Sequence, residues 1–240
     1  MKEPLEINHQ IVYHHPNNAL GASMNLLSFG YLQFNRISFI EKRDKIKILC
    51  ENFSEENAPD PYKIAEFGID QLMNSIRLTI TFENLMKALL LLNHKLIHKL
   101  SKVEFPKLYK EQFKRPIDLF DDLKNHQWSV NDKLNLNPPQ LNNQIKGIEK
   151  FTLGMRELNS ANYQTLFKID NKVINICKPY FEYRNNLHLY MGETFSLYPE
   201  FYEDILLLIN FVNSHLVRIH NDIITKLDKG EEYKLNIIEN

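Results

Sequence analysis

The fold class is decided by residues 199–227, which read PEFYEDILLLINFVNSHLVRIHNDIITKL. Pro199 stands near the first helical position, and Glu200, Glu203 and Asp204 suit the positive end of a helix dipole. Apolar side chains then recur every three or four residues, which places them on one helical face. We therefore predict a long amphipathic helix. Its apolar face comprises Ile205, Leu208, Val212, Leu216, Ile219 and Ile223.

The same periodicity appears in four other stretches of the chain. It predicts helices over residues 19–52, 61–100, 140–156 and 160–177, with Pro179 ending or kinking the last of them. The chain has only 7 Gly and 10 Pro, too few for the frequent turns of a many-stranded barrel or sandwich. The predicted fold class is therefore all-α, a bundle of long antiparallel helices.

The two longest predicted helices, 61–100 and 199–227, each carry an apolar stripe that favours burial. We therefore expect them to pack against each other in antiparallel orientation. No stretch of the chain has the composition of a linker between domains. The expected organisation is an irregular leader over 1–16, a single helical domain over 17–230 with a loop-rich insertion at about 102–140, and a frayed tail over 231–240.

Composition and charge exclude several classes of protein. The 29 Lys and Arg residues nearly balance the 30 Asp and Glu residues, so the chain has no overall basic field that would attract nucleic acid. The two cysteines are too few for a disulfide scaffold or a zinc site, and we expect both in the core. No apolar run approaches the roughly 20 residues of a membrane span, and the first residues contain no hydrophobic signal segment. We therefore expect a soluble, cytoplasmic protein.

The most unusual stretch is 178–192, KPYFEYRNNLHLYMG, which precedes the last helix. In a helix Arg184 and His188 share a face, and Asn185 stands one step round. An Arg can hold a phosphate, and a His can move a proton near neutral pH. This combination suits cleavage of RNA by its own 2′-hydroxyl, with no metal ion. The alternative is structural: Arg184 pairs with a surface carboxylate, and Asn185 caps a helix.

The string from Arg184 to His188, followed by Gly192, resembles the RN-x-x-(x)-H signature of the HEPN superfamily (higher eukaryotes and prokaryotes nucleotide-binding). The Arg–His spacing is three residues here, against four to six in most of the family. The resemblance implies an all-α, HEPN-like fold and a metal-independent endoribonuclease or RNA-binding protein of a toxin–antitoxin or phage-defence system. It assigns the catalytic roles to Arg184, Asn185 and His188.

The same resemblance implies the partners. They are a second copy of the chain, forming a homodimer in which two motifs face one cleft, together with RNA and an antitoxin protein. No metal and no cofactor are expected. The alternative is a non-catalytic helical interaction or dimerisation module with the same fold, in which the polar cluster of 184–188 holds the turn between two helices.

A second candidate surface is a basic cluster within the predicted insertion. Aromatic rings alternate with its cations, a combination that suits single-stranded RNA. The alternative is a solvated loop face, because Glu104 and Glu111 lie in the same stretch. The cations are Lys107, Lys110, Lys114 and Arg115, and the rings are Tyr109 and Phe113.

The remaining histidines do not form a motif. His94 and His98 have the i,i+4 spacing of a metal pair, but no Glu base accompanies them. His215 and His220 are five residues apart and do not share a helical face. We expect all four to lie on the surface.

Overall fold

The computed structural model describes residues 16–53, 60, 62–63, 66, 70–118, 121–123, 148–185, 197–228 and 231–239. Of these residues 69% are helical and 5% lie in strands, so the prediction of a mostly helical fold is confirmed. None of the described helices combines the length and the hydropathy needed to cross a membrane. Contacts cluster in two compact units, and the expected single domain over 17–230 stays a prediction. The first unit holds the described residues up to Leu26 and Met86–Lys168, and the second holds Leu27–Leu85 and Ile169 onward.

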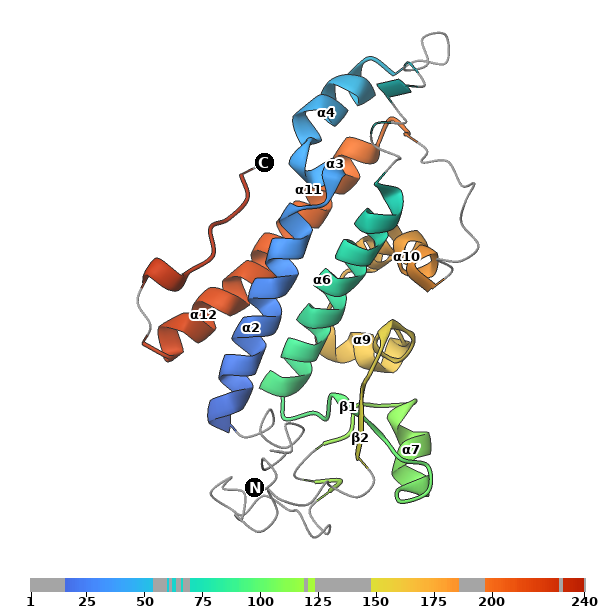
Figure 1. Cartoon of the computed structure of the whole chain (residues 1–240), viewed down its shortest axis with the longest axis vertical. Coiled ribbons are helices and arrows are strands. Elements are labelled where there is room, and N and C mark those ends of the chain that lie inside the picture. Colours follow the sequence, from blue (N-terminus) through green and yellow to red (C-terminus); the bar gives the residue numbers. More distant parts are fainter. Residues whose placement is uncertain are drawn as a thin grey trace, which may run out of the picture. The chain divides into compact units, whose positions relative to one another are not determined.

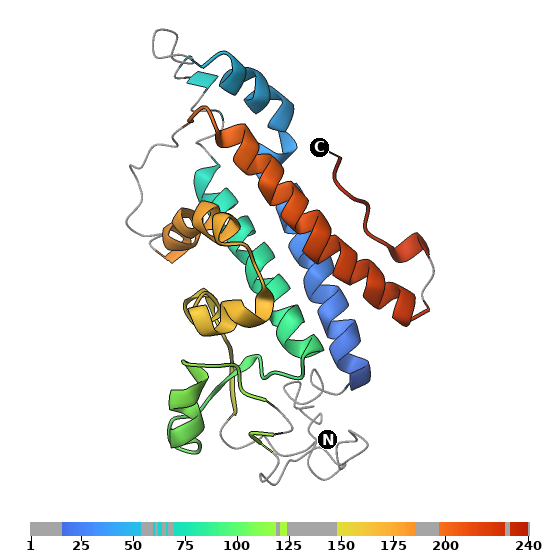
Figure 2. The ribbon, with the colours of Figure 1, turned by 180° about the vertical axis from the view of Figure 1, so that it is seen from behind.

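The second unit is built of helices (Figure 1). Three helical segments between Phe201 and Lys226 follow one another without a break, as Figure 2 shows from behind. The prediction of a helix over 199–227 is therefore confirmed to within two residues at each end. The unit contains parts of α2 (Pro16–Asn35) and α6 (Gln71–Leu92), with α3 (Ser38–Glu41), α4 (Arg43–Glu51), α10 (Asn171–Asn185), α11 (Phe201–Phe211), the π-helix η2 (Val212–Val217), α12 (Arg218–Lys226) and the 3₁₀-helix η3 (Glu231–Tyr233).

Helix α6 runs in the same direction as α11 and its continuation. At one end, α3 contacts both Asn74 of α6 and Phe201 of α11. Further along both helices, Phe82 of α6 stacks on Phe211 of α11, with ring centroids 5.5 Å apart. Residue numbers rise together along the two helices, so the prediction that they pack antiparallel is wrong.

Helix α2 runs antiparallel to both α6 and α11. Its Gly30 lies against Thr81 of α6, whose hydroxyl donates to the Gly30 carbonyl at 3.0 Å. A Cβ at Gly30 would stand 3.3 Å from the Thr81 carbonyl oxygen and 3.4 Å from a methyl group of Leu216. The absence of a side chain therefore lets three helices approach closely at this point.

Two predicted helices differ from the structure in extent. Residues 19–52 form three helices, α2, α3 and α4, because Ile37 is extended and buries its side chain completely between α2 and α3. Helix α10, in contrast, continues through Pro179 to Asn185. Its Phe181 packs edge-on against Phe82 at 5.8 Å, which anchors the last turn of α10 on the core.

The first unit contains a small antiparallel sheet where helices were predicted. Helix α6 ends at Leu92, Asn93 bonds back to the Leu89 carbonyl, and His94 adopts a left-handed conformation with φ of 55°. Strand β1 (His98–Leu100) then pairs with β2 (Ile148–Thr152). The predictions of helix to residue 100 and over 140–156 are therefore wrong in these parts.

The described part of the predicted insertion is ordered around this sheet. Helix α7 (Pro106–Gln112) follows β1, while α8 (Met155–Leu158) and α9 (Ala161–Phe167) follow β2. The buried amide of Gln112 accepts from Leu100 N at 3.0 Å and donates to the His98 carbonyl at 2.7 Å. A hydrophobic cluster joins these elements and is formed by Leu96, Leu100, Phe105, Ile117, Leu123 and Ile148.

Candidate functional site

The catalytic residues suggested by the sequence lie at the end of α10. Arg184 and Asn185 are the last two residues of this helix. Their side chains, and the whole of His188, lie outside the described residues. The turn that precedes them is held by Tyr180, which packs on Phe39 at 5.6 Å, and by Phe181. The backbone that leads into the motif is therefore fixed on the core of the second unit.

The four cations of the predicted basic cluster differ in their surroundings. Lys107, Lys110 and Lys114 are exposed on α7 and the turn after it. Arg115 is engaged internally instead: its two terminal nitrogens bind the two oxygens of Asp122 at 2.6 and 2.7 Å. The three lysines are thus exposed, whereas Arg115, partly exposed, is paired with carboxylates of the chain.

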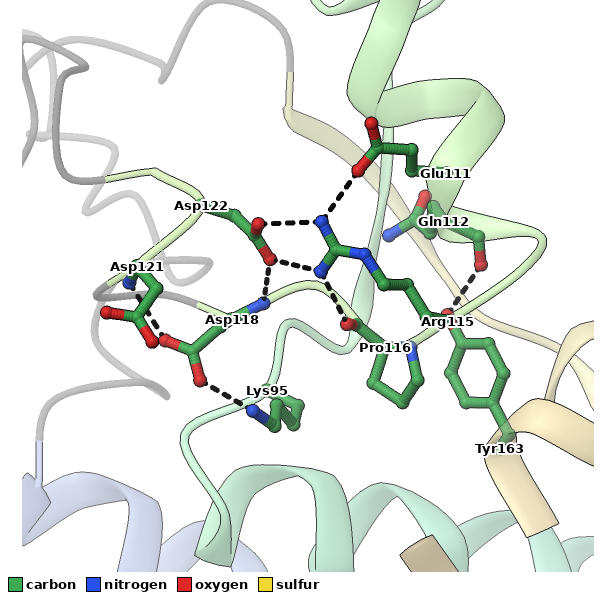
Figure 3. A network of polar contacts seen from close by, with 9 residues as sticks. All are labelled: Lys95, Glu111, Gln112, Arg115, Pro116, Asp118, Asp121, Asp122 and Tyr163. Carbon is green, nitrogen blue, oxygen red and sulfur yellow. Dashed lines mark hydrogen bonds and ion pairs between the residues drawn. The ribbon is translucent and has the colours of Figure 1, made fainter. Parts of the chain in front are cut away.

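Arg115 and Asp122 belong to a larger set of paired charges, which also includes Glu111, Asp118 and Lys95 (Figure 3). We call it the carboxylate network. Arg115 also donates to Glu111 at 2.6 Å, and Asp122 accepts from the backbone amide of Asp118 at 2.7 Å. Lys95 Nζ binds the side-chain carboxylate of Asp118 at 2.5 Å. The hydrogen bond from Arg115 holds the pKa of the Asp122 carboxyl below its usual range. The network holds the turn after α7. It also pairs the guanidinium of Arg115, one of the four cations that the sequence suggested for RNA, with carboxylates of the chain.

Two of the histidines expected on the surface are buried. His98 is 5% exposed and His220 is 2% exposed, so the surface prediction is wrong for both. His220 Nε2 lies 2.8 Å from the Ser28 hydroxyl, and its Nδ1 lies 3.2 Å from Asn221 Oδ1. Burial lowers the pKa of His220. The imidazole joins α2 to α12, and none of these three side chains lines the groove described below.

The tail over 231–239, expected to fray, is held against the last helix. Asn221 Nδ2 donates to the Leu235 carbonyl at 3.0 Å, and its Oδ1 accepts from Leu235 N at 2.8 Å. Asn213 does the same to Ile238, at 2.8 and 3.2 Å. Each carboxamide thus binds both polar groups of one tail residue, as a neighbouring strand would. We call Asn213 and Asn221 the asparagine clasp.

Two further side chains bind the tail backbone. The Tyr31 hydroxyl donates to the Asn236 carbonyl. Arg43 Nη2 donates to the Glu239 carbonyl at 2.8 Å. The tail is therefore held by contacts to its main chain from α2, α4, η2 and α12.

An open groove of about 690 Å³ borders the end of the tail. Its apolar lining includes Val173 of α10 with Leu207 and Phe211 of α11. Asp170 and Arg218 stand among its polar lining residues. The tail contributes Ile237, Ile238 and Glu239 to the same groove.

Sequence reasoning missed the clasp and its ligand. The two asparagines are eight residues apart, and in a regular α-helix this spacing does not place two side chains in line. The sequence of the tail predicts only a frayed, polar segment. The available signal was the run Leu235-Asn236-Ile237-Ile238, which is more apolar than a solvated tail requires. No group of His, Cys, Asp or Glu suited to a metal ion occurs among the described residues.

Comparison of the chain with protein-family models, with curated proteins and with solved structures gave no significant match. The resemblance to the HEPN superfamily therefore rests on residues 184–188 and on their position before the final helix.

Proposed function

We propose that this chain is a HEPN-like protein that binds RNA and cleaves it without a metal ion, as part of a toxin–antitoxin or phage-defence system. Its site is formed by Arg184, Asn185 and His188. The support is the sequence 184–188, whose first two residues end α10, with long helices before it and one long helical segment after it. His188 accepts or donates the proton, and Arg184 stabilises the charge that develops on the phosphate.

The active form in this proposal is a homodimer, whose two motifs share one cleft. The near-neutral net charge of −1 fits a small local site, so binding is expected to be weak at physiological salt. The exposed lysines of α7 and of the turn after it are proposed to contact the phosphate backbone: Lys107, Lys110 and Lys114. An antitoxin protein would bind the same dimer.

The test is cleavage of labelled single-stranded RNA in the presence of EDTA. His188→Ala and Arg184→Ala are expected to lose activity by a factor of about 10²–10⁴. Lys178→Ala is the matched control, because Lys178 is an exposed cation on the same helix. A 2′-deoxy substitution at the cleaved position should abolish cleavage. Equal behaviour of wild type, His188→Ala and Arg184→Ala, in this assay and in growth arrest, contradicts the proposal.

Light scattering tests the dimer separately. A strict monomer at micromolar concentration removes the two-motif cleft, and with it the catalytic arrangement proposed here.

A non-catalytic interaction module is the second candidate. The observation that favours it is that Arg115 and His220, which the sequence leaves exposed, both serve internal contacts. In that case Arg184 and Asn185 hold the turn, and replacing either with Ala lowers the free energy of unfolding by about 1–3 kcal/mol. A catalytic role predicts little loss of stability, or a gain. Thermal unfolding of the two variants decides between the candidates.

A further inference from the structure

The hydrogen bonds of the asparagine clasp are made to the tail's main chain, while the side chains of Leu235 and Ile238 are half-buried beside them. Both carboxamides bind main-chain groups, and Tyr31 and Arg43 also donate to main-chain carbonyls. Any extended peptide has these same groups in the same order. A site of this kind recognises the main chain of an extended segment, here through residues three apart.

The π-helix is what aligns the two asparagines. Eight residues of an α-helix turn through about 800°, so Asn213 and Asn221 would point about 80° apart. The π segment Val212–Val217 lies between them and takes one extra residue in its turn. The offset is then that of seven residues, about 20°, which places both carboxamides on one face.

The spacing also fits an extended ligand. Seven helical steps rise about 10.5 Å. Leu235 and Ile238 are three residues apart, and three extended residues span about 10 Å. Figure 2 shows the tail as a drawn-out trace that returns along the last helix. Residues three apart present their main-chain groups to the same side in a polyproline II-like chain, which has three residues per turn, and not in a flat β-strand. The two carboxamides therefore match every third residue of a polyproline II-like chain.

The tail leaves part of this surface open. The side chain of Ile237 is 64% exposed, although it borders the groove of about 690 Å³ lined by Val173, Leu207 and Phe211. A segment with a larger apolar side chain at this position would cover more of that lining. The tail thus leaves room at the position of Ile237 for a larger apolar side chain.

We propose that the asparagine clasp and the adjoining groove form a peptide-binding site, which takes an extended segment of another protein and is occupied by the chain's own tail until that segment arrives. The segment carries apolar residues three apart, at the positions of Leu235 and Ile238. A bulky apolar or aromatic residue at the position of Ile237 enters the groove. The inference gives the interaction-module candidate a specific site, and it holds equally for a protein that cleaves RNA.

The test measures binding of a labelled peptide with the sequence of residues 231–240 to the full-length chain. In one host protein, Leu235→Asp and Ile238→Asp are combined so that the chain's own tail no longer occupies the site. This tail variant is expected to bind the peptide at least about tenfold more tightly than wild type, whose site is filled. A peptide with Ile237→Phe should bind more tightly again.

Variants of the clasp supply the control. Adding Asn213→Ala and Asn221→Ala to the tail variant should abolish binding, whereas adding Asn175→Ala, on an exposed face of α10, should leave it unchanged. Asn221→Asp keeps the shape and the acceptor but places an ionised oxygen opposite the Leu235 carbonyl, so it should weaken binding. Equal binding with and without the clasp, or no binding to the tail variant, overturns the proposal.

The oligomeric state tests whether the tail of a second copy of the chain occupies the site instead. If wild type is a dimer that dissociates when Leu235→Asp and Ile238→Asp are introduced, the natural occupant is the tail of a second copy, and the proposal of another protein is overturned. Peptide binding does not involve Arg184 or His188, so its failure and the failure of RNA cleavage are separate results.

Discussion

The carboxylate network around Arg115 and the asparagine clasp perform the same task with different chemistry. Each fastens a segment without regular secondary structure to a helical region. The network uses ionised side chains, with Arg115 bound to both oxygens of Asp122. The clasp uses neutral carboxamides bound to main-chain groups. The first arrangement depends on pH, on salt and on particular partner residues, and the second depends on none of these.

The largest effect should follow Arg115→Ala. The Asp122 carboxylate, whose side chain is 16% exposed, would keep its charge and lose its bidentate partner. We expect the free energy of unfolding, measured by urea denaturation, to fall by about 2 kcal/mol. Lys114→Ala, on the exposed neighbour, should change it by less than about 0.5 kcal/mol. Equal effects of the two variants would mean that the network contributes nothing to stability.

A smaller and local effect should follow loss of either clasp residue. Asn221→Ala should speed amide hydrogen exchange at Leu235 by about 5- to 30-fold, because two hydrogen bonds are lost and each contributes about 0.5–1 kcal/mol. Asn213→Ala should act in the same way at Ile238. Asn175→Ala serves as the control. Uniform acceleration along the whole tail would show that the two asparagines act as one unit.

The final helix could be predicted because its pattern is long and unambiguous. Its apolar residues keep a helical spacing from Ile205 to Ile223, and no other period fits them. The spacing of Leu96 and Leu100 led to a wrong prediction, because four residues is close to one helical turn of 3.6 and is also twice the strand period of two. In the structure they lie with His98 on one buried face of an extended chain. Short segments are ambiguous for this reason.

The candidate contacts were less accessible to prediction. A cation such as Arg115 looks available until Asp122 folds back to it seven residues later, and that turn has no sequence signature. Asn213 and Asn221 come into line only because a π turn lies between them, which the periodicity does not reveal. The parallel direction of α6 and α11 was equally hidden, because an apolar stripe carries no direction.

The two regions should respond to acid in different pH ranges. Burial lowers the pKa values of His220 and His215 from the ordinary 6.5, so the unfolded chain takes up protons first. The free energy of unfolding should therefore fall as the pH drops below about 6.5, and it should continue to fall until the pH reaches the lowered pKa values of the two histidines in the folded chain. Asp122 has a pKa lowered from 3.8, so its contribution persists until the pH drops below about 3.8.

Urea midpoints measured at about pH 7.5 and about pH 4.5 check this difference. His220→Gln should remove part of the loss between these two pH values, because it retains polar groups for Ser28 and Asn221 and cannot take up a proton. Asp122→Asn should not alter the loss in this range, because Asp122 stays ionised throughout it. A loss that is unchanged by His220→Gln would assign the acid sensitivity to other groups.

The smallest expected effect is that of salt, and it separates the two kinds of contact most directly. Raising the salt concentration from about 0.1 M to about 1 M shortens the screening length from about 10 Å to about 3 Å. Arg115 is 43% exposed in its side chain, so its attraction to Asp122 and Glu111 is partly screened. The destabilisation caused by Arg115→Ala should therefore shrink by about 0.3–0.5 kcal/mol. The Asn221→Ala effect on hydrogen exchange at Leu235 involves no ionised group and should stay constant. If it also falls with salt, the tail is held chiefly by charges such as Arg43, and the clasp is not its principal anchor.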